Sequence, residues 1–257
     1  MAKPKLKIYG AESGGFFFTC GEVAYFFLHL LAACRTAYRS VPAIVEQIAE
    51  LGVRTLPIGS VMAVFVGMVI SLQTGIILLR YGAEASLGTI VSLSLVKELA
   101  PVMTGILVAG LGGSAMAAQL GTMTVSEEID AMRTMGINPI QFLAMPRFLA
   151  TAISMPLLVV YTIMIGLLGG SVIAASYLNI PNHTYFRSCF DALDMMEVLK
   201  GLCKATVFGI IVATIGCYYG FRTRGGAAGV GRNTTRSVVV SFMLILIANY
   251  FLTRIML

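Results

Sequence analysis

Five long apolar runs restrict the fold of this chain more than any other feature of its sequence. They cover residues 56–79, 87–120, 148–177, 205–221 and 237–253, and the only charged side chains within them are Lys97 and Glu98. A helix needs about 20 apolar residues to cross a bilayer, and only helices or closed barrels satisfy their backbone hydrogen bonds there. We therefore predict an all-α integral membrane protein with five transmembrane helices.

The overall composition agrees with a membrane protein. Hydrophobic residues make up 58% of the chain and charged residues only 12%, about half the charged fraction of a soluble domain. The net charge is +6, but the basic residues are split among short segments and form no patch with interleaved aromatics, which argues against nucleic-acid binding. Five cysteines without a Cys-x-x-Cys pair indicate neither a disulfide framework nor a zinc site. We expect no cofactor or metal in this chain.

Residues 1–50 differ from the rest, and we treat them as an N-terminal region followed by a membrane domain of residues 51–257. Polar side chains, including Glu22 and His29, recur at helical spacing between residues 15 and 36, while aromatic and aliphatic side chains fill the remaining positions. This pattern predicts an amphipathic helix lying in the membrane interface. His29 is then an interfacial side chain and not a metal ligand.

Small residues recur every fourth position within the apolar runs. The stripes are Gly67, Ser71, Gly75 in one run and Ala109, Gly113, Ala117, Gly121 in another. Such stripes allow two helix backbones to approach closely. We interpret them as packing surfaces in preference to a pore lining.

A charged stretch follows the second apolar run. Thr124 and Glu127 have the spacing of a capping box, and Gly136 and Pro139 are residues that end helices. The helix between them is amphipathic and about 17 Å long, too short to cross a bilayer. It must lie along a membrane surface, between the second and third spans. A solvated connecting helix would have the same pattern.

The order of residues in this stretch is more specific than its amphipathic pattern. The residues that carry the order are Gly121, Thr122, Met123, Val125, Glu127, Ile129, Asp130, Ala131, Met135, Gly136, Pro139, Pro146 and Arg147. This order resembles the signature of MlaE-type permeases, the membrane subunits of ABC lipid transporters of the Mla and Mce systems. The resemblance extends from about Leu51 to the end of the chain. It implies a cytoplasmic coupling helix that fits a groove in an ATPase. The side chains that we expect to contact the ATPase are Glu127, Glu128, Asp130, Met132, Arg133 and Met135.

The resemblance also implies a function and a set of partners. The chain would be a non-catalytic permease moving phospholipid between the inner membrane and an MCE-domain carrier. The assembly would hold two copies of the permease, two ATPase subunits, a hexameric MCE-domain protein and, in some systems, a STAS-domain protein. ATP and Mg²⁺ would bind the ATPase, since none of the six lysines of this chain is followed by Ser or Thr, as a phosphate-binding P-loop requires.

Two other classes of function remain as alternatives. An intramembrane lipid-modifying enzyme would carry a motif such as His-Glu-x-x-His or Gly-x-Ser-x-Gly, and neither occurs. An ion-coupled secondary transporter would use ionisable groups near the middle of the membrane, and only Lys97 and Glu98 qualify. The glycine-rich segment 221–236 follows no predicted strand, so we interpret it as a tight turn between the last two spans.

Lys97 and Glu98 are the adjacent ionisable pair inside a predicted span. Such residues are costly in a membrane and face protein or water. Pro101 cannot donate a hydrogen bond to the carbonyl of Lys97, which should leave a polar backbone group beside the pair. One hypothesis is that the pair lines a lipid-binding cavity, with apolar contacts from Ile70, Leu78, Tyr81 and Leu99. The other is that each side chain pairs with another helix and locks the bundle.

Basic residues predict the orientation in a bacterial inner membrane. With the N-terminus and coupling helix in the cytoplasm, that side carries Lys3, Lys5, Lys7, Arg35, Arg39, Arg54, Arg133, Arg147, Arg222, Arg224, Arg232 and Arg236. The other side carries Arg80, Arg187, Lys200 and Arg254. This asymmetry follows the positive-inside rule. Five spans then place the C-terminus in the periplasm, with residues 179–200 forming a short helical lid there and Lys204 reaching toward the interface.

Overall fold

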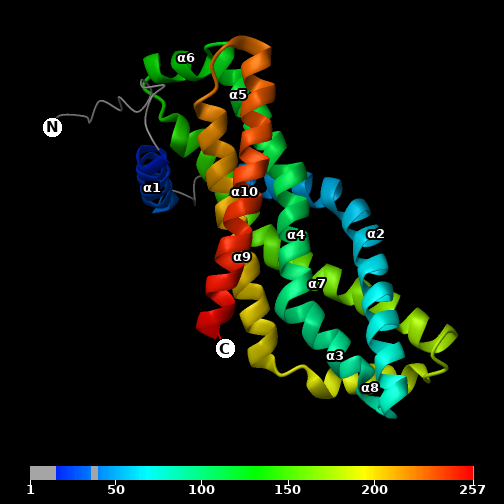
Figure 1. Ribbon diagram of the computed structural model, residues 1–257. Helices are drawn as coiled ribbons and strands as arrows, with labels where there is room; N and C mark the ends of the chain where they lie inside the picture. Colours follow the sequence, from blue (N-terminus) through cyan, green and yellow to red (C-terminus); the bar gives the residue numbers. More distant parts are fainter. Residues whose placement is uncertain (1–15, 36–39, 257) are drawn as a thin grey trace.

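The computed structural model describes residues 16–35 and 40–256, and these form a bundle of helices (Figure 1). Five helical segments are long and apolar enough to cross a membrane: Val41–Tyr81, Glu84–Val125, Ile140–Ser176, Met195–Phe221 and Gly226–Met256. A shorter apolar helix, α1 (Phe16–Ala33), precedes them. The predicted all-α architecture is confirmed. Lys3, Lys5, Lys7 and Arg39, which contribute to the predicted orientation, lie outside the described residues.

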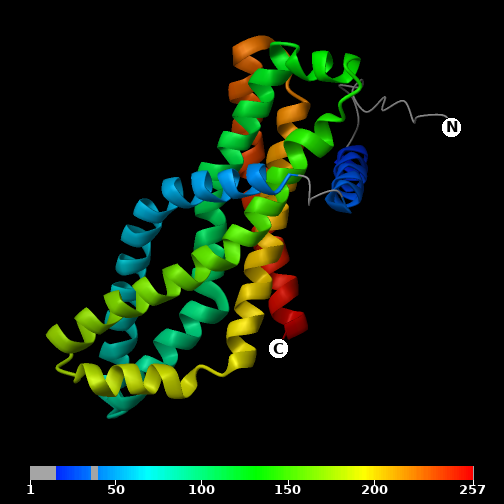
Figure 2. The same cartoon turned by 180° about the vertical axis from the view of Figure 1, so that it is seen from behind.

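The remaining elements follow the chain in order. They are α2 (Val41–Tyr81), η2 (Glu84–Ser86), α3 (Leu87–Ser94), η3 (Leu95–Leu99), α4 (Ala100–Val108), η4 (Ala109–Gly113), α5 (Ser114–Val125), α6 (Glu128–Thr134), η5 (Ile140–Ala144), α7 (Met145–Ser176), α8 (Asn182–Ala192), α9 (Met195–Phe221) and α10 (Gly226–Met256). The elements η3, η4 and η5 are single π-helical turns within longer helical segments. The short helices α6 and α8 lie at opposite ends of the bundle (Figures 1 and 2).

Three spans begin about ten or more residues earlier than the apolar runs predict. α2 begins at Val41 instead of residue 56, α9 at Met195 instead of 205, and α10 at Gly226 instead of 237. The extra turns carry charged side chains, most of them at least partly exposed, and these interrupt an apolar run without interrupting a helix. α2 has 41 residues and bends between its two halves (Figure 2). Pro57 lies within α2 and cannot donate to the carbonyl of Val53, which favours a bend there.

The glycine-rich segment is mostly helical, so the predicted tight turn is correct only for its first residues. The turn occupies residues 222–225, and α10 begins at Gly226. Gly225 and Gly226 have φ values of +86° and +66°, which a side chain would disfavour. Two glycines therefore reverse the chain between α9 and α10, and the later glycines are part of the helix.

The small-residue stripes are packing surfaces, as predicted. A Cβ atom on Gly67 in α2 would overlap the carbonyl oxygen of Gly166 in α7. A Cβ atom on Gly216 in α9 would lie 3.1 Å from the carbonyl oxygen of Gly113. Because these glycines have no side chain, the backbones of α2 and α7, and of α9 and the second span, pack in direct contact.

α1 packs against the bundle through buried aromatic and aliphatic side chains. Phe26 and Leu30 are buried against a core that includes Tyr218 and Phe221 of α9. Glu22, predicted as one of the polar side chains of an interfacial helix, does not face the membrane interface: its carboxylate lies between α1 and α9 and is bonded there. An outward face in contact with lipid favours apolar side chains, whereas a carboxylate is stabilised by partners inside the protein.

Candidate functional site

The charged stretch after the second span folds into the short helix α6. Ile129 is buried, with 2% of its surface exposed, in the core that includes Tyr218 and Phe221. Met132 is partly buried against that core. Asp130 and Arg133 form an exposed ion pair with a distance of 2.8 Å between Oδ1 and Nη1. Met135 is 68% exposed. α6 is therefore attached mainly through Ile129 and leaves its ionisable side chains exposed.

The predicted capping box is wrong. α5 continues to Val125, so Thr124 is inside a helix and its hydroxyl donates to the carbonyl oxygens of Leu120, at 2.7 Å, and Gly220, at 3.2 Å. Glu127 precedes α6 with φ +61° and makes no capping hydrogen bond with its side chain. The hydroxyl of Thr124 thus joins α5 to α9 and does not start α6, which is shorter than predicted.

A polar cleft of about 330 Å³ separates α6 from the turn between α9 and α10. Its walls combine acidic and basic side chains with the two glycines of the turn. The lining residues are Thr124, Val125, Glu127, Ile129, Asp130, Arg133, Phe221, Thr223, Arg224, Gly225 and Gly226. Three of the six predicted ATPase contacts, Glu128, Met132 and Met135, do not line this cleft. Glu128 accepts a hydrogen bond from Ser126 at 2.8 Å.

The turn beside the cleft is tied to α1. Arg222 forms an ion pair with Glu22, and its guanidinium also donates to the hydroxyl of Tyr218. Tyr218 donates to Glu22 at 2.8 Å. Partial burial lowers the pKa of Arg222, but the hydrogen bonds and the charge of Glu22 outweigh burial and raise it above its ordinary value. Arg222 therefore remains charged and connects α1 to the end of the bundle that carries α6.

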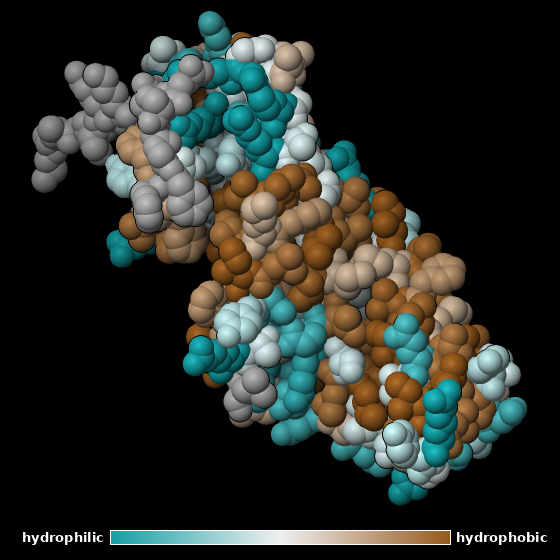
Figure 3. All heavy atoms as spheres, viewed as in Figure 1, coloured by the Kyte–Doolittle hydropathy of each residue, from teal (hydrophilic) through white to brown (hydrophobic). Residues whose placement is uncertain are grey.

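A second polar cluster lies around η3, far from α6. The carboxylate of Glu98 accepts hydrogen bonds from Lys204 of α9 at 2.6 Å and from Asn249 and Thr253 of α10 at 2.9 and 2.8 Å. Lys97 forms an ion pair with Glu197 of α9 at 3.1 Å. Glu98 thus joins three helical segments, and Lys97 joins two. Figure 3 shows a hydrophilic patch that interrupts the hydrophobic belt beside the C-terminal end of α10.

Lys204 completes this cluster, and the prediction that it reaches toward the interface is wrong. Only 4% of its side chain is exposed. Its ammonium donates to Glu98, to Thr253 at 2.8 Å and to the carbonyl oxygen of Lys97 at 2.9 Å. That carbonyl is the group that Pro101 cannot bond, and η3 is the π-helical turn just before Pro101. Burial of the Lys204 ammonium is stabilised by these three hydrogen-bond acceptors.

The four predicted apolar contacts do not all gather at this cluster. Ile70, Leu78 and Leu99 pack against one buried apolar core, whereas Tyr81 lies at the end of α2 and is 80% exposed. Leu99 also borders a cavity of about 10 Å³ next to Met62, which has room for about one water molecule. Three of the four predicted contacts are thus partly buried within one chain, and Tyr81 is exposed.

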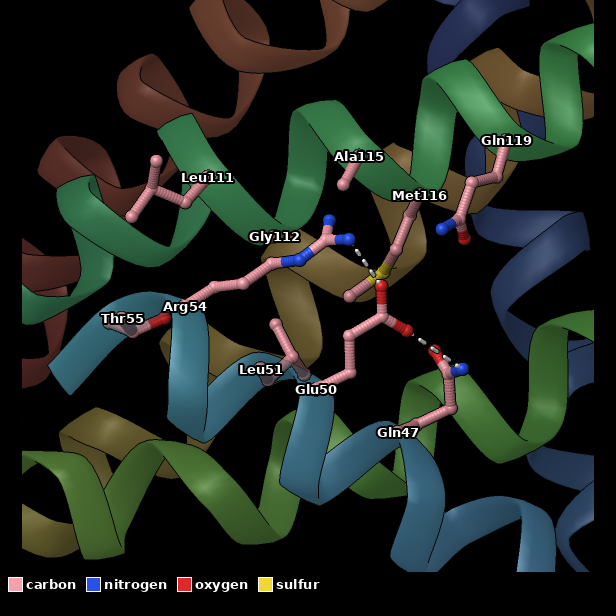
Figure 4. Close-up of a pocket in the computed structure, with 10 residues that line it drawn as sticks. All are labelled: Gln47, Glu50, Leu51, Arg54, Thr55, Leu111, Gly112, Ala115, Met116 and Gln119. Carbon is pink, nitrogen blue, oxygen red and sulfur yellow. Dashed lines mark hydrogen bonds and ion pairs between the residues drawn. The ribbon is translucent and has the colours of Figure 1, made fainter.

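Figure 4 shows a third polar group, between the first half of α2 and α5. Arg54 pairs with Glu50 at 2.9 Å, and Gln47 donates to Glu50 at 3.5 Å. Gln119 lies at the other end of the pocket and accepts a hydrogen bond from Arg147 at 3.3 Å. The pocket holds about 20 Å³, so we assign it to packing between α2 and α5. Arg147 is part of the helix packing and not of the exposed end.

Sequence reasoning identified Lys97 and Glu98 but missed their partners. Glu197, Lys204, Asn249 and Thr253 are about 100 or more residues away along the chain. One signal was present, because Asn249 is the only asparagine in the apolar run 237–253. A carboxamide within a span indicates a polar partner on another helix.

Comparison with known proteins identifies the family. Residues 44–255 match the family described as Permease MlaE. A protein of Rickettsia typhi named "Probable ABC transporter permease protein" is 42% identical over 83% of this chain and 82% of its own length. A Synechocystis protein with the same description is 40% identical, over 93% of this chain and 89% of its own. The "Intermembrane phospholipid transport system permease protein MlaE" of Haemophilus influenzae is 33% identical, over 96% and 95%. This chain therefore belongs to the MlaE permease family and is the multi-pass membrane permease of an ABC-type transporter.

Proposed function

We propose that this permease moves phospholipid between the inner membrane and an MCE-domain carrier, using ATP hydrolysed by a separate ATPase. The observation that carries the proposal is the arrangement of α6. A short helix attached through Ile129 presents acidic and basic side chains beside a polar cleft, at one end of a bundle of spans. Such a surface suits a soluble partner, because charged side chains at a protein interface fix partner choice and register.

The ATPase would contact Glu127, Glu128, Asp130 and Arg133, with Met132 or Met135 filling a pocket on its surface. ATP and Mg²⁺ would bind that partner. The proposed orientation in the membrane places α6 and the N-terminus in the cytoplasm, and α8 and the C-terminus in the periplasm. The asymmetry of basic residues supports this orientation.

The lipid would contact the cluster around η3. The ammonium of Lys97 is partly exposed and could meet a phosphate oxygen, while Glu98 holds the surrounding polar network. Ile70, Leu78, Leu99 and Tyr81 would meet acyl chains. The relative named for intermembrane phospholipid transport supports this class of substrate. Because the five spans of one chain are too few to enclose a lipid path, the path would lie between two copies of the permease. The hexameric MCE-domain protein would receive lipid at the α8 end, and a STAS-domain protein is a further possible subunit.

Charge reversal on α6 tests the proposal. We expect the double variant Glu127→Lys, Asp130→Lys to insert and fold normally, because both side chains are exposed. Like charges placed against a partner cost several kcal/mol, so recovery of the ATPase with the permease should fall by at least about tenfold. The measurement is the amount of ATPase retained by the tagged permease and its rate of ATP hydrolysis.

The matched control is Glu84→Lys, Asp191→Lys, which changes the charge equally at the α8 end through two exposed carboxylates. This control should retain the ATPase. Normal ATPase recovery and turnover in the α6 variant would contradict the proposal.

A further inference from the structure

The turn between α9 and α10 forms one wall of the cleft beside α6, and one residue of that turn faces the other way. Residues 221 and 223–226 line the cleft, but Arg222 does not. Its guanidinium donates instead to the carboxylate of Glu22 in α1 and to the hydroxyl of Tyr218. Arg222 therefore holds the back of the wall whose front borders the cleft.

The contact between α1 and this wall is largely enclosed by protein. Only 13% of the Glu22 side chain and 26% of the Arg222 side chain are exposed, and Tyr218 is buried. Phe26 of α1 packs against the rings of Tyr218 and Phe221. Charge-assisted hydrogen bonds are stronger than neutral ones, and a low local dielectric strengthens them further. The contact therefore fixes the distance between α1 and the turn.

Other contacts of the turn lead to the spans. Thr223 is buried beside Gly121 of α5, and a Cβ atom on Gly121 would lie 2.9 Å from the hydroxyl oxygen of Thr223. Asn233 of α10 donates to that hydroxyl at 3.3 Å. Thr223 thus holds the turn to α5 and α10, whereas Arg222 holds it to α1. The position of the cleft wall therefore depends on α1 as well as on the spans.

α1 has a second face, which points away from the bundle. In both views α1 lies beside the half of the bundle that carries α6 (Figures 1 and 2). Its exposed large apolar side chains include Phe18, Leu28 and Leu31, which suit contact with lipid. A helix with lipid on one face and the turn on the other would link the position of the turn to the membrane surface.

We propose that Glu22 and Arg222 are positioning residues for the cleft, so that α1 controls how tightly the ATPase docks there. Neither side chain contacts the ATPase, and the pair acts through the turn of residues 222–225. This inference rests on the proposed function, because it takes the partner at the cleft to be the ATPase. Loss of the pair would leave the front of the wall intact but free to move.

Tryptic cleavage of the permease alone, in lipid nanodiscs, tests the turn without the ATPase. Glu22→Gln removes the charge and keeps the size of the side chain. Cleavage after Arg224, which is exposed in the turn, should become about fivefold faster, because the cleavage rate follows the population of the open form. Cleavage after Arg133, on the opposite wall, should keep its rate. Equal acceleration at both sites would indicate a general loosening of the bundle and would overturn the proposal, as would an unchanged rate at Arg224.

The matched control is Glu50→Gln, which neutralises a carboxylate that is also paired with an arginine, Arg54. This pair lies between α2 and α5 and not at the turn, so both cleavage rates should equal those of the unmodified protein. Faster cleavage after Arg224 in the control would contradict a specific role of Glu22.

A double-mutant cycle on the complex tests docking. Glu22→Gln, Arg222→Gln and the double variant should each raise the Kd of the ATPase for the permease by at least about fivefold. The double variant should be no weaker than the weaker single variant, because two residues that act through one contact are not additive. Effects that multiply in the double variant would overturn the proposal.

The charge reversal on α6 separates this inference from the proposed function. If that reversal raises the Kd but Glu22→Gln does not, the positioning role is wrong and the docking surface stands. If neither change affects the Kd, the docking surface itself is wrong, and the positioning role fails with it.

Discussion

The two charged regions of this permease, α6 and the cluster around η3, use the same kinds of side chain in opposite ways. On α6 the ion pair Asp130–Arg133 is local and exposed, and the helix is attached through Ile129. Around η3, Glu98 and Lys204 connect segments from three parts of the chain, and Lys204 is buried. Exposed local pairs contribute little to stability, whereas breaking a buried pair is costly. The exposed pair on α6 can therefore be changed with little effect on the fold, whereas loss of the buried Lys204 should destabilise the bundle.

The largest effect on stability is expected for Lys204→Met. This change leaves Glu98 and the carbonyl of Lys97 without their ammonium donor. Because 38% of the Glu98 side chain is exposed, solvent compensates in part, and we expect a loss of about 2–3 kcal/mol. Thermal unfolding of the detergent-solubilised protein, followed by size-exclusion chromatography, measures it. Lys200→Met is the control, since Lys200 is partly exposed and pairs with Glu197 outside the buried cluster. Equal melting temperatures for both variants would mean that the cluster does not lock the bundle.

A smaller and local effect is expected for Ile129→Ala. Truncating this buried side chain costs about 2 kcal/mol or more at the contact, yet the contact joins α6 to the end of the bundle and does not join one span to another. α6 should detach while the bundle keeps its melting temperature. Tryptic cleavage after Arg133 reports detachment, and Met135→Ala, which truncates an exposed side chain, is the control. If the melting temperature of Ile129→Ala fell as far as that of Lys204→Met, the two regions would not be independent.

The fold was largely predictable because membrane insertion depends on local sequence. The five spans follow from apolar length, and a close approach of another backbone to α2 follows from the stripe containing Gly67, although the stripe does not indicate that α7 is the partner. The starts of α2, α9 and α10 were not predictable from hydropathy, since charged residues on an exposed helical face do not end a helix. The capping box failed because α5 continues past Leu120 and Thr124 bonds to α5 and α9 instead.

The cluster around η3 was predictable only in part. Glu98 and Lys97 are conspicuous because they are charged within an apolar run, and the free carbonyl follows from Pro101. Their partners depend on which helices become neighbours, and Lys204 and Asn249 are separated from Glu98 by 106 and 151 residues. Spacing along one helix contains no information about such contacts. Lys204, next to an apolar run, has the same local sequence whether it faces the interface or the interior.

The central claim is that α6 serves the ATPase whereas Lys97 serves the lipid. The most direct test is the amount of phospholipid moved per ATP hydrolysed by the reconstituted complex, comparing Lys97→Met with Lys200→Met. Both lysines pair with Glu197, at 3.1 and 3.2 Å, so each variant removes one charge and leaves that carboxylate one partner. The account predicts that Lys97→Met keeps normal ATP hydrolysis but moves less lipid per ATP, whereas Lys200→Met matches the unmodified complex. Equal ratios in both variants and the unmodified complex would contradict it.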